Sequence, residues 1–198
     1  MADKTIKAAK KLMRTEVTNI LSTMSEANRE QQSNEIFEKL MNNEKFKQSQ
    51  RVSVFINMAD EIKTAKIIEE IFKQGKRCFI PRIILKSKHM DMVEMSSLEE
   101  IHNLPTIKWG MRQPEVVDKE AMDVGGLDFM VVPGVAFGPD CSRLGHGSGY
   151  YDYYFARYKA KFGNLPHLAG LCFREQIKDA IPMTEFDVRV HEVITSTN

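Results

Sequence analysis

Hydrophobic residues near the start of the chain recur every three or four positions, which predicts two consecutive amphipathic helices. The first helix is expected over about 4–24, with a stripe of basic residues beside its apolar stripe. Ser25 is a suitable N-cap for the second helix, and Asn42 with Asn43 is expected to end it. This N-terminal helical pair should pack its apolar faces against the rest of the protein.

The middle of the chain alternates short apolar runs with helical patterns, which is typical of an α/β fold. The run 51–57 is rich in β-branched and aromatic residues with little alternation, as in a parallel strand buried on both faces. A helical pattern over 64–74 ends at Gly75, and 77–81 then supplies a second strand, which completes a right-handed β-α-β unit. Further expected elements are a half-exposed strand at 89–95, a short capped helix within 96–105, and strands at 127–133, 167–173 and 192–195.

Composition and charge narrow the class of protein. The 198 residues are 42% hydrophobic, which is enough for one core and short for two, so we expect a single α/β domain over 1–198 with a mainly parallel sheet flanked by helices. A net charge of +1 provides no broad field for nucleic acid or an anionic membrane, and no apolar run is long enough to span one. Three cysteines without metal-site spacing favour a reducing, cytoplasmic location. We also expect a monomer.

The segment 143–149 carries three glycines at alternating positions. Glycine tolerates positive φ and lets a ligand approach backbone N–H groups, so this spacing predicts a loop that wraps an anion. The loop leads directly into a helical pattern in which Tyr150, Tyr154 and Tyr158 recur every four residues. Because a helix N-terminus has unpaired N–H groups and a partial positive charge, phosphate is the expected ligand at this junction.

The chain lacks the sequence motifs of several common nucleotide-binding, zinc and serine hydrolase sites. The chain contains no P-loop, and its glycines do not follow the G-x-G-x-x-G spacing of dinucleotide-binding folds. The five histidines include no pair on one helix face and no cysteine partner, which disfavours a zinc site. Ser148 does not stand at the centre of a G-x-S-x-G nucleophile elbow, which disfavours a serine hydrolase.

Residues outside the glycine loop could complete a phosphate site. Lys10 and Arg14 belong to the basic stripe of the first helix, which is either a solvated face or the edge of a phosphate site. Ile56 and Glu61 follow the C-terminal end of the first strand, where ligands bind in open α/β sheets. Glu61 has an alternative role as a first-turn acid that favours the dipole of the next helix.

Three further residues, Trp109, Asp152 and Asp187, are candidates for the site. Trp109 lies in a loop with glycine and proline, where its ring either packs on the core or forms a stacking wall for a planar ligand. Asp152, in the first turn of the tyrosine helix, either complements the helix dipole or, beside a polyphosphate, binds magnesium. Mg²⁺ commonly takes one or two carboxylates along with phosphate oxygens and water, and Asp187 is the candidate for the second.

The decapeptide 143–152, RLGHGSGYYD, resembles the R-L-G-x-G-x-G-Y-Y-D signature of the 5-formyltetrahydrofolate cyclo-ligases, also called methenyltetrahydrofolate synthetases. Further matches follow in order along nearly the whole chain, at Lys10 and Arg14, 60–62, 79–82, 89–93, the Trp109 loop, 133–134 and 174–177. The resemblance implies the α/β fold shared with the phosphosugar isomerases and CoA transferases. It also implies ATP- and Mg²⁺-dependent cyclisation of 5-formyltetrahydrofolate to 5,10-methenyltetrahydrofolate, with ADP and phosphate released.

The same resemblance implies roles for individual residues. Those expected to bind ATP are Lys10, Arg14, Arg143, Leu144, Gly145, His146, Gly147, Ser148, Gly149, Tyr150 and Tyr151. Those expected to contact the folate are Ile56, Glu61, Trp109, His146, Gly147, Ser148, Gly149 and Tyr150. Asp152 and Asp187 are assigned to Mg²⁺, and Arg143 to the charge on the transferred phosphoryl group. The chain need not supply a nucleophile, because phosphoryl transfer depends mainly on positioned cations and metal.

The chain departs from the family pattern inside its own signature. Members often carry Arg and Lys where His146 and Ser148 stand, so up to two fixed positive charges are missing. We expect Arg143 and the two cations of the first helix to compensate, and ATP affinity to weaken as rising pH removes the proton of His146. His191 also stands where relatives tend to have an acid, and its role is left open.

The sequence also allows two alternative functions. A folate- or nucleotide-binding homologue with reduced or no turnover is supported by the substituted loop. A phosphosugar isomerase or CoA transferase on the same fold would need a catalytic base or a glutamate nucleophile, and shared fold is weak support for shared function.

Overall fold

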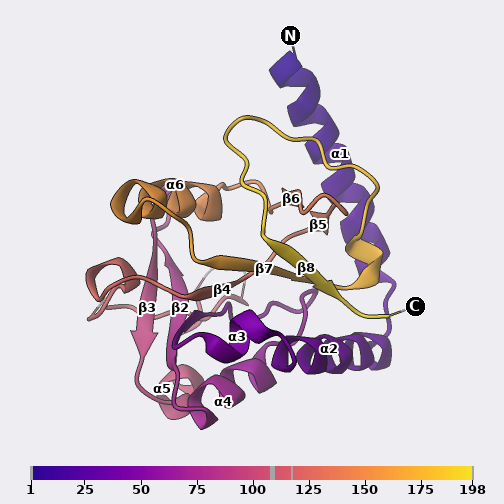
Figure 1. The fold of residues 1–198 in the computed structure, drawn as a ribbon. Helices are drawn as coiled ribbons and strands as arrows, with labels where there is room; N and C mark the ends of the chain where they lie inside the picture. Colours follow the sequence, from indigo (N-terminus) through magenta and orange to yellow (C-terminus); the bar gives the residue numbers. More distant parts are fainter. Residues whose placement is uncertain (1, 108–109, 117, 198) are drawn as a thin grey trace.

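A six-stranded sheet forms the centre of the protein, in the order β3-β2-β1-β4-β7-β8 (Figure 1). The computed structural model describes residues 2–107, 110–116 and 118–197. Neighbouring strands are parallel except β2 and β3, which run antiparallel. The strands are β1 (Arg51–Ser53), β2 (Arg77–Ile83), β3 (Met90–Met95), β4 (Phe129–Val132), β7 (His167–Cys172) and β8 (Glu192–Thr195). The prediction of a single α/β domain with a mainly parallel sheet is confirmed.

Helices lie on both sides of this sheet. In Figure 1, α2 to α5 lie below the sheet, α6 lies above it, and α1 extends past it toward the N-terminus. Successive strand residues therefore face different cores: Cys78 and Ile80 belong to one hydrophobic cluster and Phe79 to the other. The helices are α1 (Ala2–Ser22), α2 (Glu26–Met41), α3 (Glu44–Gln48), α4 (Ala65–Lys73), α5 (Leu98–His102) and α6 (Tyr150–Phe162), with 3₁₀ turns η2 (Ala121–Asp123) and η3 (Arg174–Gln176).

The residues predicted to begin and end α2, α4 and α5 lie at the ends of these helices. The Ser25 side chain accepts a hydrogen bond from the backbone N–H of Asn28 at 3.2 Å, and α2 ends at the C-cap Asn42. Gly75 follows α4 with a φ of 68°, a conformation that costs glycine little. The short helix expected within 96–105 is α5, capped by Ser97.

Two predictions about strands were wrong in detail. The first strand covers only β1, not the whole run 51–57: Val54 N–H still donates to Phe79 O at 2.9 Å, and the chain then leaves the ladder. This departure carries Phe55 and Ile56 to the edge of the sheet. Strand β3 is almost entirely buried and not half-exposed, because α6 and η2 pack on it.

A small antiparallel ribbon lies beside the main sheet and carries the first residues of the glycine loop. It pairs β5 (Ala136–Phe137) with β6 (Arg143–Leu144). The Phe137 ring packs directly on Gly170 of β7, where an added Cβ would lie 2.9 Å from ring atom Cδ1. Glycine at that position lets the ribbon approach the sheet closely.

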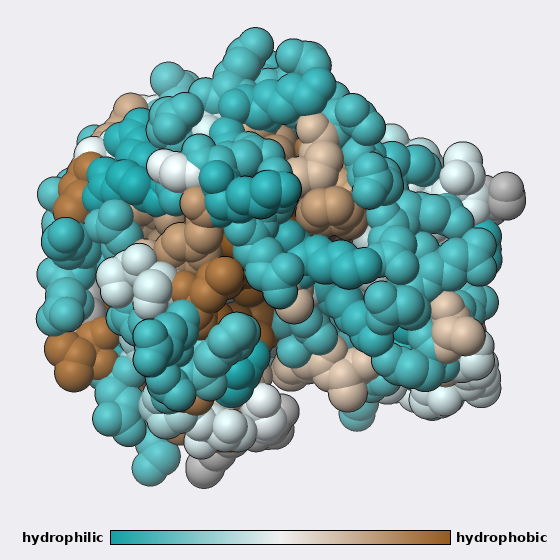
Figure 2. Space-filling view, turned by 90° about the horizontal axis from the view of Figure 1, so that it is seen from below, coloured by the Kyte–Doolittle hydropathy of each residue, from teal (hydrophilic) through white to brown (hydrophobic). Residues whose placement is uncertain are grey.

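The surface is mostly hydrophilic. The view in Figure 2 shows a hollow near the middle of one face, with hydrophobic residues at its floor and hydrophilic residues around its rim. Among the described residues, none of the helices combines the length and apolar character needed to cross a membrane.

Candidate functional site

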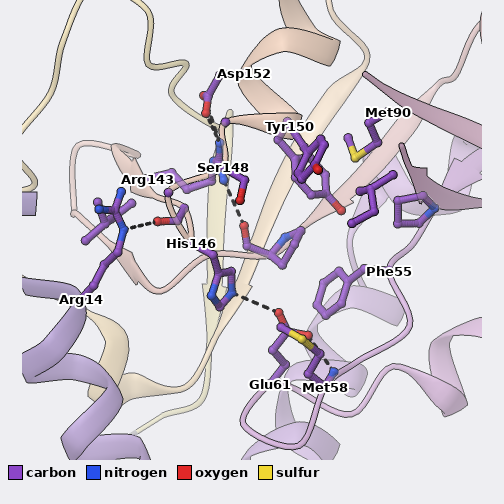
Figure 3. Close-up of a pocket in the computed structure, with 18 of the residues that line it drawn as sticks. Arg14, Phe55, Met58, Glu61, Met90, Arg143, His146, Ser148, Tyr150 and Asp152 are labelled. Carbon is purple, nitrogen blue, oxygen red and sulfur yellow. Dashed lines mark hydrogen bonds and ion pairs between the residues drawn. The ribbon is translucent and has the colours of Figure 1, made fainter. Parts of the chain in front are cut away.

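A pocket of about 700 Å³ lies where β1, β2 and β4 end, bounded by α1, by the turn after β1 and by the glycine loop (Figure 3). These strands are parallel, so their carboxyl ends meet at one edge of the sheet. Of the residues assigned to ATP, folate or metal from the sequence, those in the described ranges all line this pocket. Trp109, the remaining one, lies outside the described residues.

The glycine loop connects β6 to α6 and turns sharply at two positions. Gly147 has a φ of 108°, and Gly149, the N-cap of α6, has a φ of 74°. Both angles favour glycine, since a side chain would be strained there. Gly149 provides no side-chain cap for α6, which leaves the first N–H groups of that helix available to an anion.

Arg143 is the buried cation at the base of the loop, with 4% of its surface exposed. Its Nη2 donates to both carboxylate oxygens of Asp152 at 3.0 Å, and Nη1 donates to Pro133 O at 3.3 Å. Its Nε is buried and finds no hydrogen-bond partner among the described residues. A buried N–H without a partner is costly, so the guanidinium retains a donor that a ligand could satisfy.

Helix α1 closes one side of the pocket with two cations. Lys10 donates to the Asp187 carboxylate, and Arg14 Nε donates to the carbonyl of Gly145 at 2.7 Å. Burial lowers the pKa of Arg14 from its ordinary value, although Asp187 opposes the shift. Burial alone would raise the pKa of Asp187, but hydrogen bonds from Lys10 and Thr184 outweigh it, and the pKa lies below the usual range. The basic stripe of α1 is thus partly inside the pocket, and not wholly a solvated face.

The turn after β1 supplies an acid on the opposite side. Glu61 Oε2 accepts the backbone N–H of Met58 at 2.8 Å, and Oε1 lies 3.4 Å from Nε2 of His146 on the glycine loop. Helix α4 begins at Ala65, so Glu61 precedes it and is not a first-turn acid. Ile56 lines the pocket from the same segment.

Several pocket residues were missed by reasoning from the sequence. Phe55 could have been found, because it precedes Ile56 in the run 51–57 that was predicted to be a strand. Gln113 had no such signal: its side-chain amide accepts from Ile83 N–H at 2.9 Å and donates to Ile83 O at 3.0 Å, which attaches a distant loop to β2. Other pocket residues that the sequence did not indicate are Met58, Pro81, Ile83, Met90, Met111, Arg112 and Thr184.

Asp152 and Asp187 lie in the same pocket, and Val188 N–H donates to Asp152 Oδ1 at 3.3 Å. The described residues contain no cluster of three or more His, Cys, Asp or Glu side chains suited to a metal ion. Mg²⁺ commonly takes only one or two carboxylates and completes its shell with phosphate oxygens and water. The donor set therefore fits Mg²⁺ bound together with a polyphosphate better than Mg²⁺ alone.

Comparison with known proteins identifies the family. The family model described as the 5-formyltetrahydrofolate cyclo-ligase family matches residues 6–196. The chain belongs to this family. The mouse 5-formyltetrahydrofolate cyclo-ligase is 42% identical over 196 residues, which cover 98% of this chain and 97% of the mouse protein. A probable 5-formyltetrahydrofolate cyclo-ligase of Caenorhabditis elegans is 39% identical over 192 residues, or 96% of this chain and 93% of that one.

A solved structure agrees with this membership. The 5,10-methenyltetrahydrofolate synthetase of Aquifex aeolicus superposes with a TM-score of 0.78 at 25% identity, covering 96% of this chain and 90% of the other. These cyclo-ligase relatives favour the family indicated by the 143–152 signature over the phosphosugar isomerase or CoA transferase alternative.

Proposed function

We propose that this protein catalyses the ATP- and Mg²⁺-dependent cyclisation of 5-formyltetrahydrofolate to 5,10-methenyltetrahydrofolate, with release of ADP and phosphate. The names of its relatives support the substrate and the product. The single observation that carries the proposal is the make-up of the pocket, in which a cationic, glycine-lined end opens directly onto an apolar wall. A folate and a triphosphate could therefore meet in one enclosure.

The cationic end suits a triphosphate. Arg14 contacts the glycine loop from α1, Arg143 lies at the base of the loop, and the open N-terminus of α6 adds backbone N–H groups. Charge-assisted hydrogen bonds of this kind are the stronger ones, and guanidinium groups match phosphate geometry. Lys10 completes the cationic set from α1, one helical turn before Arg14.

The other end suits a folate ring. Phe55 and Ile56 provide apolar contacts, and the Glu61 carboxylate can accept hydrogen bonds from the N–H groups of a reduced pterin. The 2.8 Å bond from Met58 N–H holds this carboxylate in place before a ligand arrives.

Asp152 and Asp187 are the residues that would hold Mg²⁺. When bound, the ion neutralises phosphate charge as phosphoryl transfer proceeds. In the free protein, Arg143 and Lys10 balance the two carboxylates, so the negative charges are held near the site without an ion.

The proposed chemistry needs no nucleophile from the chain. The formyl oxygen attacks the γ-phosphorus and ADP leaves. N10 then attacks the activated formyl carbon and loses its proton to water, and the C–O bond breaks to release phosphate. Arg143 stabilises the negative charge of the transferred group. His146 supplies one positive charge to the loop when it is protonated, and its ion pair with Glu61 connects the two ends of the pocket. We also propose a cytoplasmic monomer, in keeping with the free cysteines and the balanced charge.

A direct assay tests the proposal. Purified protein is incubated with 5-formyltetrahydrofolate and MgATP, and formation of the methenyl product is followed by its absorbance, with omission of ATP and chelation of Mg²⁺ as controls. The proposal predicts product only in the complete mixture, with one phosphate released per product. An absence of ATP-dependent product would overturn it. Calorimetric binding of both ligands in that case would support the alternative of a binding homologue with little or no turnover.

A further inference from the structure

One cation of the pocket stands apart from the others. Among the described residues, the cationic side chains that line the pocket are Lys7, Lys10, Arg14, Arg112 and Arg143. Lys10 and Arg143 are already paired with carboxylates, Arg14 donates to Gly145 O at 2.7 Å, and Lys7 is exposed. Arg112 has no carboxylate within ion-pair distance in the described ranges, and its one hydrogen bond there is a long one of 3.5 Å to His102 O. Its guanidinium therefore keeps most of its donors for another group.

The segment that carries Arg112 is firmly attached to the sheet. Thr106 and Arg112 form an antiparallel bridge, and Ile107 N–H donates to Met111 O at 2.7 Å. The Gln113 amide makes two hydrogen bonds to the backbone of Ile83. Arg112 thus projects from a backbone that is positioned before any ligand binds.

Arg112 and the base of the glycine loop are attached to different strands of the sheet. The Arg112 segment is bonded to β2, whereas Arg143 at the base of the loop donates to Pro133 O directly after β4, and β1 lies between these two strands. Two strand spacings separate these two points of attachment by roughly 10 Å. The wall between them is apolar and includes Phe55, Pro81 and Met90. Arg112 is thus attached to a different strand than the buried Arg143, and apolar residues line the same pocket.

This arrangement suits the chemical order of the substrate named in the proposed function, on which the inference rests. 5-Formyltetrahydrofolate carries its formyl group on the pterin ring, followed by a p-aminobenzoyl group and then by glutamate with two carboxylates. The formyl group must lie at the phosphate end to receive a phosphoryl group, so the glutamate must point away from it. We propose that Arg112 is a specificity-determining residue that binds the glutamate carboxylates through its guanidinium fork.

The test compares two ligands that differ only in the glutamate. Affinities for 5-formyltetrahydrofolate and for 5-formyltetrahydropteroate, which lacks it, are measured by calorimetry with wild type, Arg112→Gln and Arg112→Lys. Arg112→Gln should weaken binding of the glutamate-bearing ligand about tenfold and leave the pteroate unchanged within about twofold. Arg112→Lys, which keeps the charge without the fork, should give an intermediate loss. Lys119→Ala is the matched control, because it removes an exposed cation outside the pocket and should change neither affinity.

The outcomes separate this inference from the proposed function. Equal effects of Arg112→Gln on both ligands would overturn the role of Arg112, whatever the turnover assay shows. A tenfold loss confined to the glutamate-bearing ligand would support it even in a protein that forms no product. Failure of the wild type to form product with MgATP, while it still binds the folate, would contradict the proposed function alone.

Discussion

The ion pair between Lys10 and Asp187 joins α1 to the segment before β8 across the edge of the pocket. Only 12% of the Lys10 side chain and 18% of the Asp187 side chain are exposed, so solvent screens the pair weakly. Thr184 Oγ1 also donates to the same carboxylate at 2.8 Å. Lys10→Met removes the charge and leaves a half-buried carboxylate with fewer partners. We expect the free energy of unfolding to fall by about 1.5–3 kcal/mol, which corresponds to a drop in Tm of about 3–12 °C.

Urea unfolding at pH 7 of the wild type, Lys10→Met, Asp187→Asn and the double variant measures this interaction. The coupling free energy should be about 1–2 kcal/mol, because Asp187→Asn removes the charge that Lys10→Met leaves unpaired. Lys7→Met is the matched control, since Lys7 is exposed, and it should change stability by less than about 0.5 kcal/mol. The pKa of Asp187 is lowered, so the coupling is present above the ordinary aspartate pKa of about 4 and is lost as pH falls through the folded value. A coupling below about 0.3 kcal/mol at pH 7 would refute the reasoning.

Two further predictions concern the framework. Gly170→Ala should lower the free energy of unfolding by about 1–3 kcal/mol, because the new Cβ overlaps the Phe137 ring. In urea unfolding, adding Phe137→Leu to this variant should recover part of that loss. Strictly additive losses from the two substitutions would contradict the contact. His191 Nδ1 accepts the backbone N–H of Leu168 at 2.9 Å, and its pKa lies below the usual range because packing removes water from part of the ring and His167 adds like charge. Stability from this bond is fully present above about pH 6.5 and is lost as pH falls through the folded value. Between pH 7.5 and 5.5 the wild type should therefore lose about 0.5 kcal/mol more than His191→Asn, whose amide oxygen can still accept, and equal losses would count against this role.

The helices and strands could be predicted because their signals are local. The apolar stripe of α1 and the cap at Ser25 depend on residues a few positions apart, and so does the stop at Gly75. The length of β1 could not be predicted, because a strand ends where its neighbours cease to provide partners. The burial of β3 likewise depends on α6, which begins far along the chain at Tyr150.

The position of the site could be predicted better than its internal contacts. The glycine spacing indicated a loop beyond a strand, and that is where Gly147 and Gly149 lie. No pattern indicated that Arg143 would bind both oxygens of Asp152, since this pairing requires the chain to turn back from β6 into α6. The importance of Arg112 was also hidden, because it depends on side-chain contacts that attach a distant loop to β2, made by Gln113 and Arg82.

The central claim is that the formyl oxygen becomes bonded to the γ-phosphoryl group in this pocket and leaves with the phosphate. Turnover of 5-formyltetrahydrofolate labelled with ¹⁸O in the formyl group tests this most directly, with the released phosphate analysed by mass spectrometry. The account predicts that each phosphate formed carries one ¹⁸O from the formyl group. Release of unlabelled phosphate during formation of the methenyl product would contradict it.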